Sequence, residues 1–289
     1  MSWVSIDYDK CNSCGICLEI CVNCFSREDD SISVNADERL CNICGHCVAL
    51  CPAGAISHDQ MDMGNFNAVK KDKFVPPEDF FEFLRQRRSH RHFKKQRIEK
   101  RDMEKLVEVV RYSPTGSNRQ SVELLVIQDP ARIKLLSNLS VDFLADNGAR
   151  MVKDLEKMKA EGKGTFEEIS MMEMIAMYGE MLKKARDMGR DPIFYGASAV
   201  VVFHSKCGII LPKDDCVIAS TTMGLLARTM GLEFTYIGLF ENAANNHPSI
   251  KEELNLPDDN QVFSVIIIGY PKFRFLRTVD RKPVVVKWG

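Results

Sequence analysis

The sequence lacks a strong net charge, a long apolar run and a visible secretion signal. The formal net charge of −1 argues against nucleic acid as the general partner of the chain. The longest apolar stretches, residues 197–203 and 262–268, are too short to cross a bilayer. The first residues, MSWVSIDYDK, have no basic end followed by an apolar stretch, so no signal peptide is expected. We therefore expect a cytoplasmic protein without a membrane or nucleic-acid partner.

Two common sources of chemistry are also missing. No G-x-G-x-x-G motif follows a predicted strand, so a dedicated dinucleotide-binding unit is not evident. No Ser/His/Asp or Cys/His arrangement stands out, and we therefore name no catalytic side chain. What remains is a composition with 45% apolar and 27% charged residues, typical of a globular protein. The length of 289 residues suggests roughly two domains.

Cysteine is the residue type that the sequence has in excess, with eleven in all. Eight of them form two runs, and each member of the first run recurs 30 residues later. The runs are Cys11, Cys14, Cys17 and Cys21, then Cys41, Cys44, Cys47 and Cys51. Both have the C-x2-C-x2-C-x3-C spacing of two-cluster bacterial ferredoxins. Thiols that bind iron–sulfur clusters fit a reducing compartment, which agrees with a cytoplasmic protein.

The ferredoxin pattern implies a ligand set for each of two [4Fe-4S] clusters. In that pattern three closely spaced cysteines of one run share a cluster with the last cysteine of the other. The first set is Cys11, Cys14, Cys17 and Cys51, and the second is Cys41, Cys44, Cys47 and Cys21. The alternative is zinc, which usually takes its thiolates as two separated pairs, an arrangement that suits these triplets poorly.

The surroundings of the two runs differ. Residues 52–56 follow the second run as they do in ferredoxins, whereas Val22 stands where the first run usually has proline. Cys24 is an extra thiol, and we expect it to be a small buried side chain rather than a ninth ligand. A three-iron cluster or an exchanged ligand is the alternative interpretation of Cys24.

Charge is divided unevenly along the chain. Residues 1–60 hold three basic and nine acidic residues, a formal charge of −6, and the remainder holds 36 basic and 31 acidic residues, a formal charge of +5. Opposite charges could help the two parts dock, or could steer a basic redox partner to the cysteine-rich part. An ordinary solvated acidic surface explains the same asymmetry equally well.

The sequence predicts a two-cluster domain over residues 1–60, a linker over 61–76 and an α+β domain over 77–289. Within the last, periodicity predicts helices near residues 77–88, 99–112, 214–230 and 249–254, and strands near 122–127, 197–204 and 262–268. Residues 140–190 are predicted to be mostly helical and are rich in methionine. Packing between helices is the favoured explanation of these methionines, and a flexible lid over a substrate pocket is the alternative.

One basic stretch is a candidate ligand site. If residues 87–92 are extended, alternation sets Arg87, Ser89 and Arg91 against Arg88, His90 and His92. Two guanidinium groups and a hydroxyl on one side would make a good clamp for a phosphate. A solvated basic strand is an equal alternative.

Four segments together resemble, in order and spacing, the FMN-dependent nitroreductase family: LRQRRSHRHF, SPTGSNRQ, GLEFTYIG and DRKP. The resemblance covers about residues 77–289. With residues 1–60 in front, the chain is similar to the subgroup in which a two-cluster ferredoxin module is fused to a nitroreductase domain. The resemblance implies an α/β sandwich and a homodimer with an FMN at each end of the interface.

The same resemblance implies which residues bind the flavin. The first flavin motif is matched by Arg87, Ser89 and Arg91, the second by Ser117, Asn118 and Gln120, and the backbone that passes the reactive N5 by Ile237 and Gly238. Either Arg281 or Lys282 matches the C-terminal phosphate contact. In similar proteins the segment with Phe194 and Tyr195 approaches the substrate side. Departures from the family pattern occur at Thr115, Gly116, Arg119 and Tyr236, and they leave the substrate open.

These cofactors suggest a route for electrons. Iron–sulfur clusters pass one electron at a time, whereas FMN can collect two and deliver a hydride. We hypothesise that a low-potential donor protein or NAD(P)H supplies electrons, and that a nitro compound, a quinone or an activated alkene receives them. The alternative is an electron-transfer or redox-sensing flavoprotein that relays electrons to a protein partner.

Overall fold

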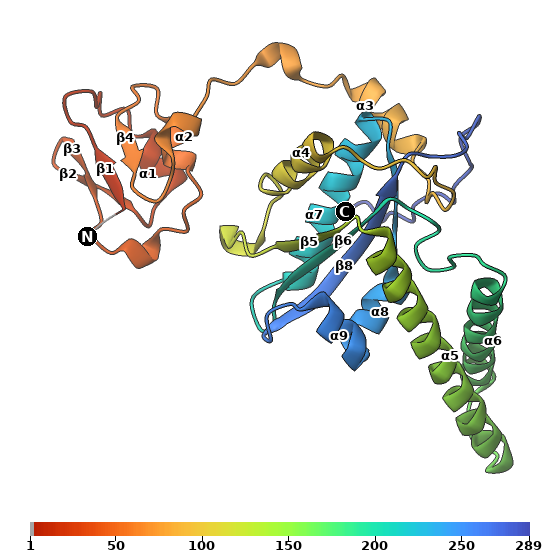
Figure 1. The fold of residues 1–289 in the computed structure, drawn as a ribbon. Helices are drawn as coiled ribbons and strands as arrows, with labels where there is room; N and C mark the ends of the chain where they lie inside the picture. The colour runs from red at the N-terminus through yellow and green to blue at the C-terminus, as the bar shows by residue number, and fades with distance from the viewer. Residues whose placement is uncertain (1–2) are drawn as a thin grey trace. The chain divides into compact units, whose positions relative to one another are not determined.

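The chain divides into two units (Figure 1). The structure, a computed structural model, describes residues 3–289, with the backbone alone at Lys71. One unit reaches to Asp79 and includes Ser117–Arg119, and the other comprises Phe80–Gly116 and Gln120–Gly289. Among the described helices, none combines the length and the apolar character needed to cross a membrane.

The first unit contains two small antiparallel sheets. Strand β1 (Val4–Ile6) pairs with β4 (Ile56–His58), and β2 (Phe25–Glu28) pairs with β3 (Ser31–Val34). A small core between them buries Val4, Cys17, Cys24, Phe25, Ile32, Cys47 and Ile56. Because three of these seven residues are cysteines, this core leaves little apolar area to hold the unit together.

Each of the two cysteine runs contains one short helix. Helix α1 (Ile16–Ile20) begins after Gly15, and α2 (His46–Leu50) begins after Gly45. These glycines have φ of 80° and 72°, a left-handed conformation that a side chain would disfavour. The repeat in sequence is therefore a repeat in structure, with one glycine-initiated helix in each half.

Residues after β4 form mainly exposed loops with two single turns of 3-10 helix, η2 (Met63–Asn65) and η3 (Lys71–Lys73). Helix α3 (Pro77–Arg85) follows, with proline in its first turn and acidic residues at its positive end. The absence of a hydrophobic period in the sequence of 61–76 agrees with the exposed backbone there.

The second unit is built on one antiparallel sheet with the order β5-β6-β8-β7. Its strands are β5 (Glu123–Ile127), β6 (Ala199–Lys206), β7 (Glu233–Tyr236) and β8 (Asn260–Gly269). The central strands β6 and β8 are almost continuously apolar because helices cover both faces of the sheet.

Helices cover the sheet in two layers (Figure 1). One face packs against α4 (Lys100–Val110) and α7 (Pro212–Thr229). The other packs against α5 (Pro130–Ala160), α6 (Phe166–Asp187), α8 (Gly238–Asn246) and α9 (Pro248–Leu254). Alternate residues of β6 serve the two faces, since Val200 and Val202 belong to one core and Val201 to the other. This architecture confirms the predicted mixed helix-and-sheet domain.

Helices α5 and α6 form a long hairpin in which the two backbones approach closely (Figure 1). A Cβ added at Gly179 would lie 2.8 Å from the carbonyl oxygen of Leu144, and one added at Gly148 would lie 3.1 Å from that of Ala176. Thr165 and Glu168 begin α6 with reciprocal side-chain to backbone hydrogen bonds.

The methionines of α6 correct one prediction. Four side chains lie exposed along this helix, at Met171, Met174, Met177 and Met181. Packing between helices of one chain therefore does not explain these four residues. The expected elements α4, α7, α9, β5, β6 and β8 are confirmed near their predicted positions. Helix α8 was not predicted, and α5 begins ten residues before the expected helical region.

Candidate functional site

Cysteines of the first predicted ligand set line one cavity in the first unit. Its lining includes Cys11, Cys14, Cys17 and Cys51, together with Cys47 from the other set. The rest of the lining is mostly apolar, with Ile6, Ile16, Ile32, Ala53, Ala55 and Ile56. Burial raises the pKa of the Cys17 thiol, and the neighbouring Cys11 and Cys14 raise it further. A metal that binds here would release thiol protons, because thiolate is the ligating form.

The second predicted set is also gathered around Cys47. Burial raises the pKa of the Cys47 thiol to about 11, and negative charge on Cys21, Cys44 or Cys41 raises it further. Cys24 lies beside this group and is 5% exposed, which confirms the expectation of a small buried side chain. Burial and hydrogen bonding with Cys21 and Cys41 raise the pKa of Cys24 to about 12.

His58 approaches the second set from β4. Its ring is 2% exposed, and its Nε2 lies 3.3 Å from Sγ of Cys41. Its Nδ1 accepts the backbone N–H of Gln60 at 3.1 Å, so the ring proton of the neutral side chain lies on Nε2 and is donated to the sulfur. Burial lowers the pKa of His58, which favours this neutral form. The residue 30 positions earlier is Glu28, which is exposed, so the two halves of the repeat differ here.

Within residues 3–289, no group of three or more His, Cys, Asp or Glu side chains is placed to hold one ion. A cluster takes its thiols at separate corners around a cavity, which matches the lining formed by Cys11, Cys14, Cys17 and Cys51.

In the second unit, residues 87–92 lie between α3 and α4 and belong to neither a helix nor a strand. The even-numbered side contacts the C-terminal tail (residues 270–289): Arg88 Nη2 donates to the carbonyl of Val279 at 3.0 Å, and His90 Nε2 donates to that of Phe273 at 3.0 Å. The stretch pairs with the sheet only loosely, as the N–H of His90 reaches the carbonyl of Phe234 at 3.5 Å.

The odd-numbered side of the stretch is left for a ligand. Ser89 and Arg91 are exposed and Arg87 is half-buried. Within the described chain, no carboxylate lies at ion-pair distance from the guanidinium of Arg87 or Arg91. Arg91 lies over the ring of Tyr195, 5.8 Å from its centre. The cations predicted to hold a phosphate are therefore not neutralised by the protein.

The loop of the second predicted motif has a strained backbone. Ser117, Asn118 and Gln120 have φ of 52°, 51° and 50°, a left-handed conformation that is rare outside glycine. Strain of this kind concentrates at functional sites. The N–H of Gly116 donates to Oδ1 of buried Asp215 at 2.9 Å, which fixes the beginning of the loop. The boundary between the units falls here, so Ser117 and Asn118 are not brought into one unit with Gln120.

Ile237 and Gly238 stand at the beginning of α8, directly after β7. Ile237 is 5% exposed and its N–H donates to the carbonyl of Val265 at 2.9 Å. Gly238 is exposed, and a Cβ added there would meet nothing within 4 Å. The open main chain at the positive end of a helix can accept a flat, electron-rich ring at close range.

Phe194 and Tyr195, expected near the substrate side, differ in their burial. Phe194 is fully buried and its ring packs 4.9 Å from that of Phe240, so it belongs to the core and cannot contact a substrate. Tyr195 is half-buried in a left-handed conformation with φ of 54°, and burial raises its pKa. Asp191 accepts the N–H groups of Ile193 at 3.2 Å and Phe194 at 3.0 Å and so holds this turn.

Arg281 and Lys282 are both exposed in the C-terminal tail, beyond the last strand. No carboxylate of the described residues pairs with either side chain. Both are therefore accessible to a phosphate.

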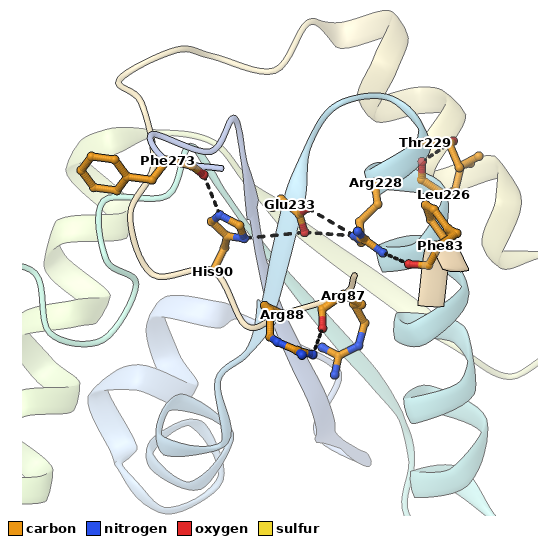
Figure 2. A network of polar contacts seen from close by, with 9 residues as sticks. All are labelled: Phe83, Arg87, Arg88, His90, Leu226, Arg228, Thr229, Glu233 and Phe273. Carbon is orange, nitrogen blue, oxygen red and sulfur yellow. Dashed lines mark hydrogen bonds and ion pairs between the residues drawn. The ribbon is translucent and has the colours of Figure 1, made fainter. Parts of the chain in front are cut away.

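Sequence reasoning missed a buried polar network behind the first motif, shown in Figure 2. Glu233 lies 3.7 Å from Nδ1 of His90 and 3.2 Å from Nε of Arg228. Arg228 also donates to the carbonyl of Phe83 at 2.6 Å. Glu233 and Arg228 lie far from residues 87–92 in sequence. The sequence indicated only that His90 lies on the opposite side of that stretch from Arg87, Ser89 and Arg91.

Comparisons with known proteins come from sequence and from fold. A sequence model described as Nitroreductase family matches residues 84–270. An NADPH-dependent oxidoreductase of Staphylococcus epidermidis is 25% identical over 194 residues, which are 66% of this chain and 64% of that protein. The chain thus spans less than two thirds of the length of this curated relative.

Two solved structures are similar in fold. One is a nitroreductase with bound FMN from Bacteroides fragilis, with a TM-score of 0.53 and 16% identity, covering 73% of this chain and 99% of that one. The other is a nitroreductase with bound FMN from Desulfitobacterium hafniense, with a TM-score of 0.52 and 17% identity, covering 72% and 97%.

Proposed function

This chain belongs to the Nitroreductase family, and from that premise we propose that it is an FMN-dependent oxidoreductase with two [4Fe-4S] clusters in its N-terminal unit. Bound FMN would supply two-electron chemistry, and the clusters would supply electrons singly. The acceptor is a small electrophile of the class of nitro compounds, quinones or activated alkenes.

The observation that supports the cluster part most is the cavity of the first unit. The four cysteines that the ferredoxin pattern assigns to one cluster meet there although Cys51 is distant in sequence from Cys11, Cys14 and Cys17. The predicted domains, 1–60 for the clusters and 77–289 for the flavin, are part of the same proposal.

Residues of the second unit fit an FMN. Arg87 and Arg91 carry positive charge that no carboxylate of the described chain neutralises, as binding of a phosphate requires. Ser89 offers a hydroxyl between them, and Gly238 offers an open main chain at the beginning of α8. In this proposal these residues bind and orient the cofactor, and Tyr195 bounds the site beside Arg91.

We also propose that the protein is a homodimer. Large apolar side chains are exposed on α3 and on the C-terminal tail, including Phe80, Phe81, Leu276, Val285 and Trp288. Burying such side chains between two copies would be favourable at roughly 25 cal/mol per Å² of apolar surface. Sedimentation of the purified protein at several concentrations measures this association.

The test of function uses protein purified without oxygen. We expect bound flavin, iron and sulfide, and bleaching of the flavin on mixing with NADH, NADPH or a reduced ferredoxin. Reoxidation by nitroaromatics, quinones or enoates would identify the acceptor class. A protein that holds no flavin and takes none up contradicts the proposal. Failure of every small acceptor, with rapid oxidation by a protein partner, would instead favour the electron-relay alternative.

A further inference from the structure

The side chains of Arg88 and His90 bind the C-terminal tail. Arg88 donates to the carbonyl of Val279 and His90 donates to that of Phe273, each at 3.0 Å. The ring of His90 also packs edge-on against Phe275, with centroids 5.0 Å apart. The tail is thus held at two points six residues apart.

Backbone contacts extend this attachment. The N–H of Lys272 donates to the carbonyl of His92 at 2.9 Å, and the N–H of Lys94 donates to that of Tyr270 at 2.8 Å. These bonds fix the beginning of the tail, but beyond Phe273 the contacts come from the side chains of Arg88 and His90.

Charged side chains lie behind His90 (Figure 2). The side chains of His90 and Arg228 are each 7% exposed, and that of Glu233, which lies between them, is 17% exposed. Arg228 is fixed in turn by the carbonyl of Phe83 and by the ring of Phe83, 4.5 Å from its guanidinium. The anchor for the tail therefore combines a buried side chain, His90, with a half-buried one, Arg88.

We propose that Arg88 and His90 are positioning residues that hold the tail so that Arg281 or Lys282 reaches the phosphate of FMN. Val279 lies two residues before Arg281, so the anchored carbonyl limits the main-chain reach to that cation to about 7 Å. In this proposal the odd-numbered residues of the stretch contact the flavin, and Arg88 and His90 bind the tail. This inference rests on the proposed FMN site.

A single substitution tests the anchor through flavin affinity. Arg88→Leu removes the donor to Val279 and keeps an apolar stem. We expect the Kd for FMN added to flavin-free protein to rise about tenfold, the loss expected for one hydrogen bond from a charged group. Lys95→Leu is the matched control, since it removes one positive charge from an exposed side chain nearby. Equal effects of the two substitutions would overturn the proposal, because general attraction of the phosphate would then explain both.

A double-mutant cycle separates positioning from a general loss of structure. Replacing Arg281 and Lys282 together by alanine should weaken FMN binding strongly in the native background. In the Arg88→Leu background the same replacement should add little, because the tail is already released. Additive effects would mean that Arg88 and the tail cations act independently, which contradicts the proposal.

Trypsin provides a readout that needs no flavin. The tail carries Arg274, Arg277 and Arg281, and we expect cleavage there, followed by mass spectrometry, to be faster in Arg88→Leu than in Lys95→Leu. An unchanged cleavage rate would show that Arg88 does not hold the tail. If the native protein binds no FMN, the proposed function fails together with this inference; if it binds FMN and Arg88→Leu matches its control, the inference alone fails.

Discussion

At the scale of single residues, His58 is the most consequential contact in the first unit. Its Nε2 donates to Sγ of Cys41 at 3.3 Å from a buried position. A hydrogen bond to a sulfur ligand stabilises the more negative, reduced cluster. If a cluster binds Cys41 as proposed, we expect its reduction potential to fall by about 60 mV in His58→Phe, which corresponds to a tenfold weaker affinity for the electron.

Potentiometric titration followed by electron paramagnetic resonance measures the change. The cluster proposed on Cys11 is the internal control and should keep its potential. Loss of iron from the variant would make His58 a folding residue, and an unchanged potential with full iron content would contradict the expected role of the hydrogen bond.

A second buried histidine is expected to lower the stability of the folded protein at acid pH. His204 is 4% exposed, and burial lowers its pKa below the ordinary value. Since its pKa is lower in the folded chain, the unfolded chain binds more protons in that range, and stability is lost as the pH falls below about 6.5. We expect His204→Gln to reduce this loss, by at most roughly 1.4 kcal/mol per pH unit.

Urea unfolding at pH 7 and pH 5.5 provides the measurement for His204. The free energy of unfolding should decrease less between the two pH values in the variant than in the native protein. Equal decreases would show that His204 does not control the acid sensitivity.

At the scale of elements, the α5–α6 hairpin depends on its glycines. For Gly179→Val we expect a loss of about 1–3 kcal/mol, because a side chain would be forced against the carbonyl of Leu144. Glu180→Val is the control, as it places the same β-branched residue at the next, exposed position of the helix. Thermal unfolding should separate the two variants; similar melting temperatures would mean that helix propensity, rather than close approach, sets the cost.

Elements with a clear period were predictable and those without one were not. Met103, Leu106 and Val110 gave α4 its helical face, and apolar runs gave β6 and β8. Helix α8 has the sequence GLFENAANN, in which asparagines obscure the pattern. The exposed methionines of α6 and the buried Phe194 show that residue type alone does not place a side chain at a surface or in a core.

At the scale of the whole molecule, we expect the two cofactor sites to be lost separately. Cys41→Ser should reduce the iron content and leave FMN bound, whereas Arg87→Ala with Arg91→Ala should lose FMN and keep iron, because the thiols and the guanidinium groups lie in different units. Iron, sulfide and flavin analysis of both variants provides the measurement. Loss of both cofactors in either variant would mean that the units do not fold independently.

The sequence predicted the components of the candidate site better than their arrangement. Local spacing was enough to predict the cysteine sets and the alternation in residues 87–92. It could not predict that Glu233 and Arg228 support His90, because those contacts join segments distant in sequence. Nor could it predict that His58 donates to Cys41, since a lone histidine has no spacing to interpret.

The pair of Glu28 and His58 has one more consequence. Two identical halves would bind two clusters of equal reduction potential, and electron transfer between them would have no preferred direction. If each half binds a cluster as proposed, the histidine ring that faces a sulfur in one half and the exposed carboxylate in the other would make the two reduction potentials unequal, and electrons would favour the cluster beside His58.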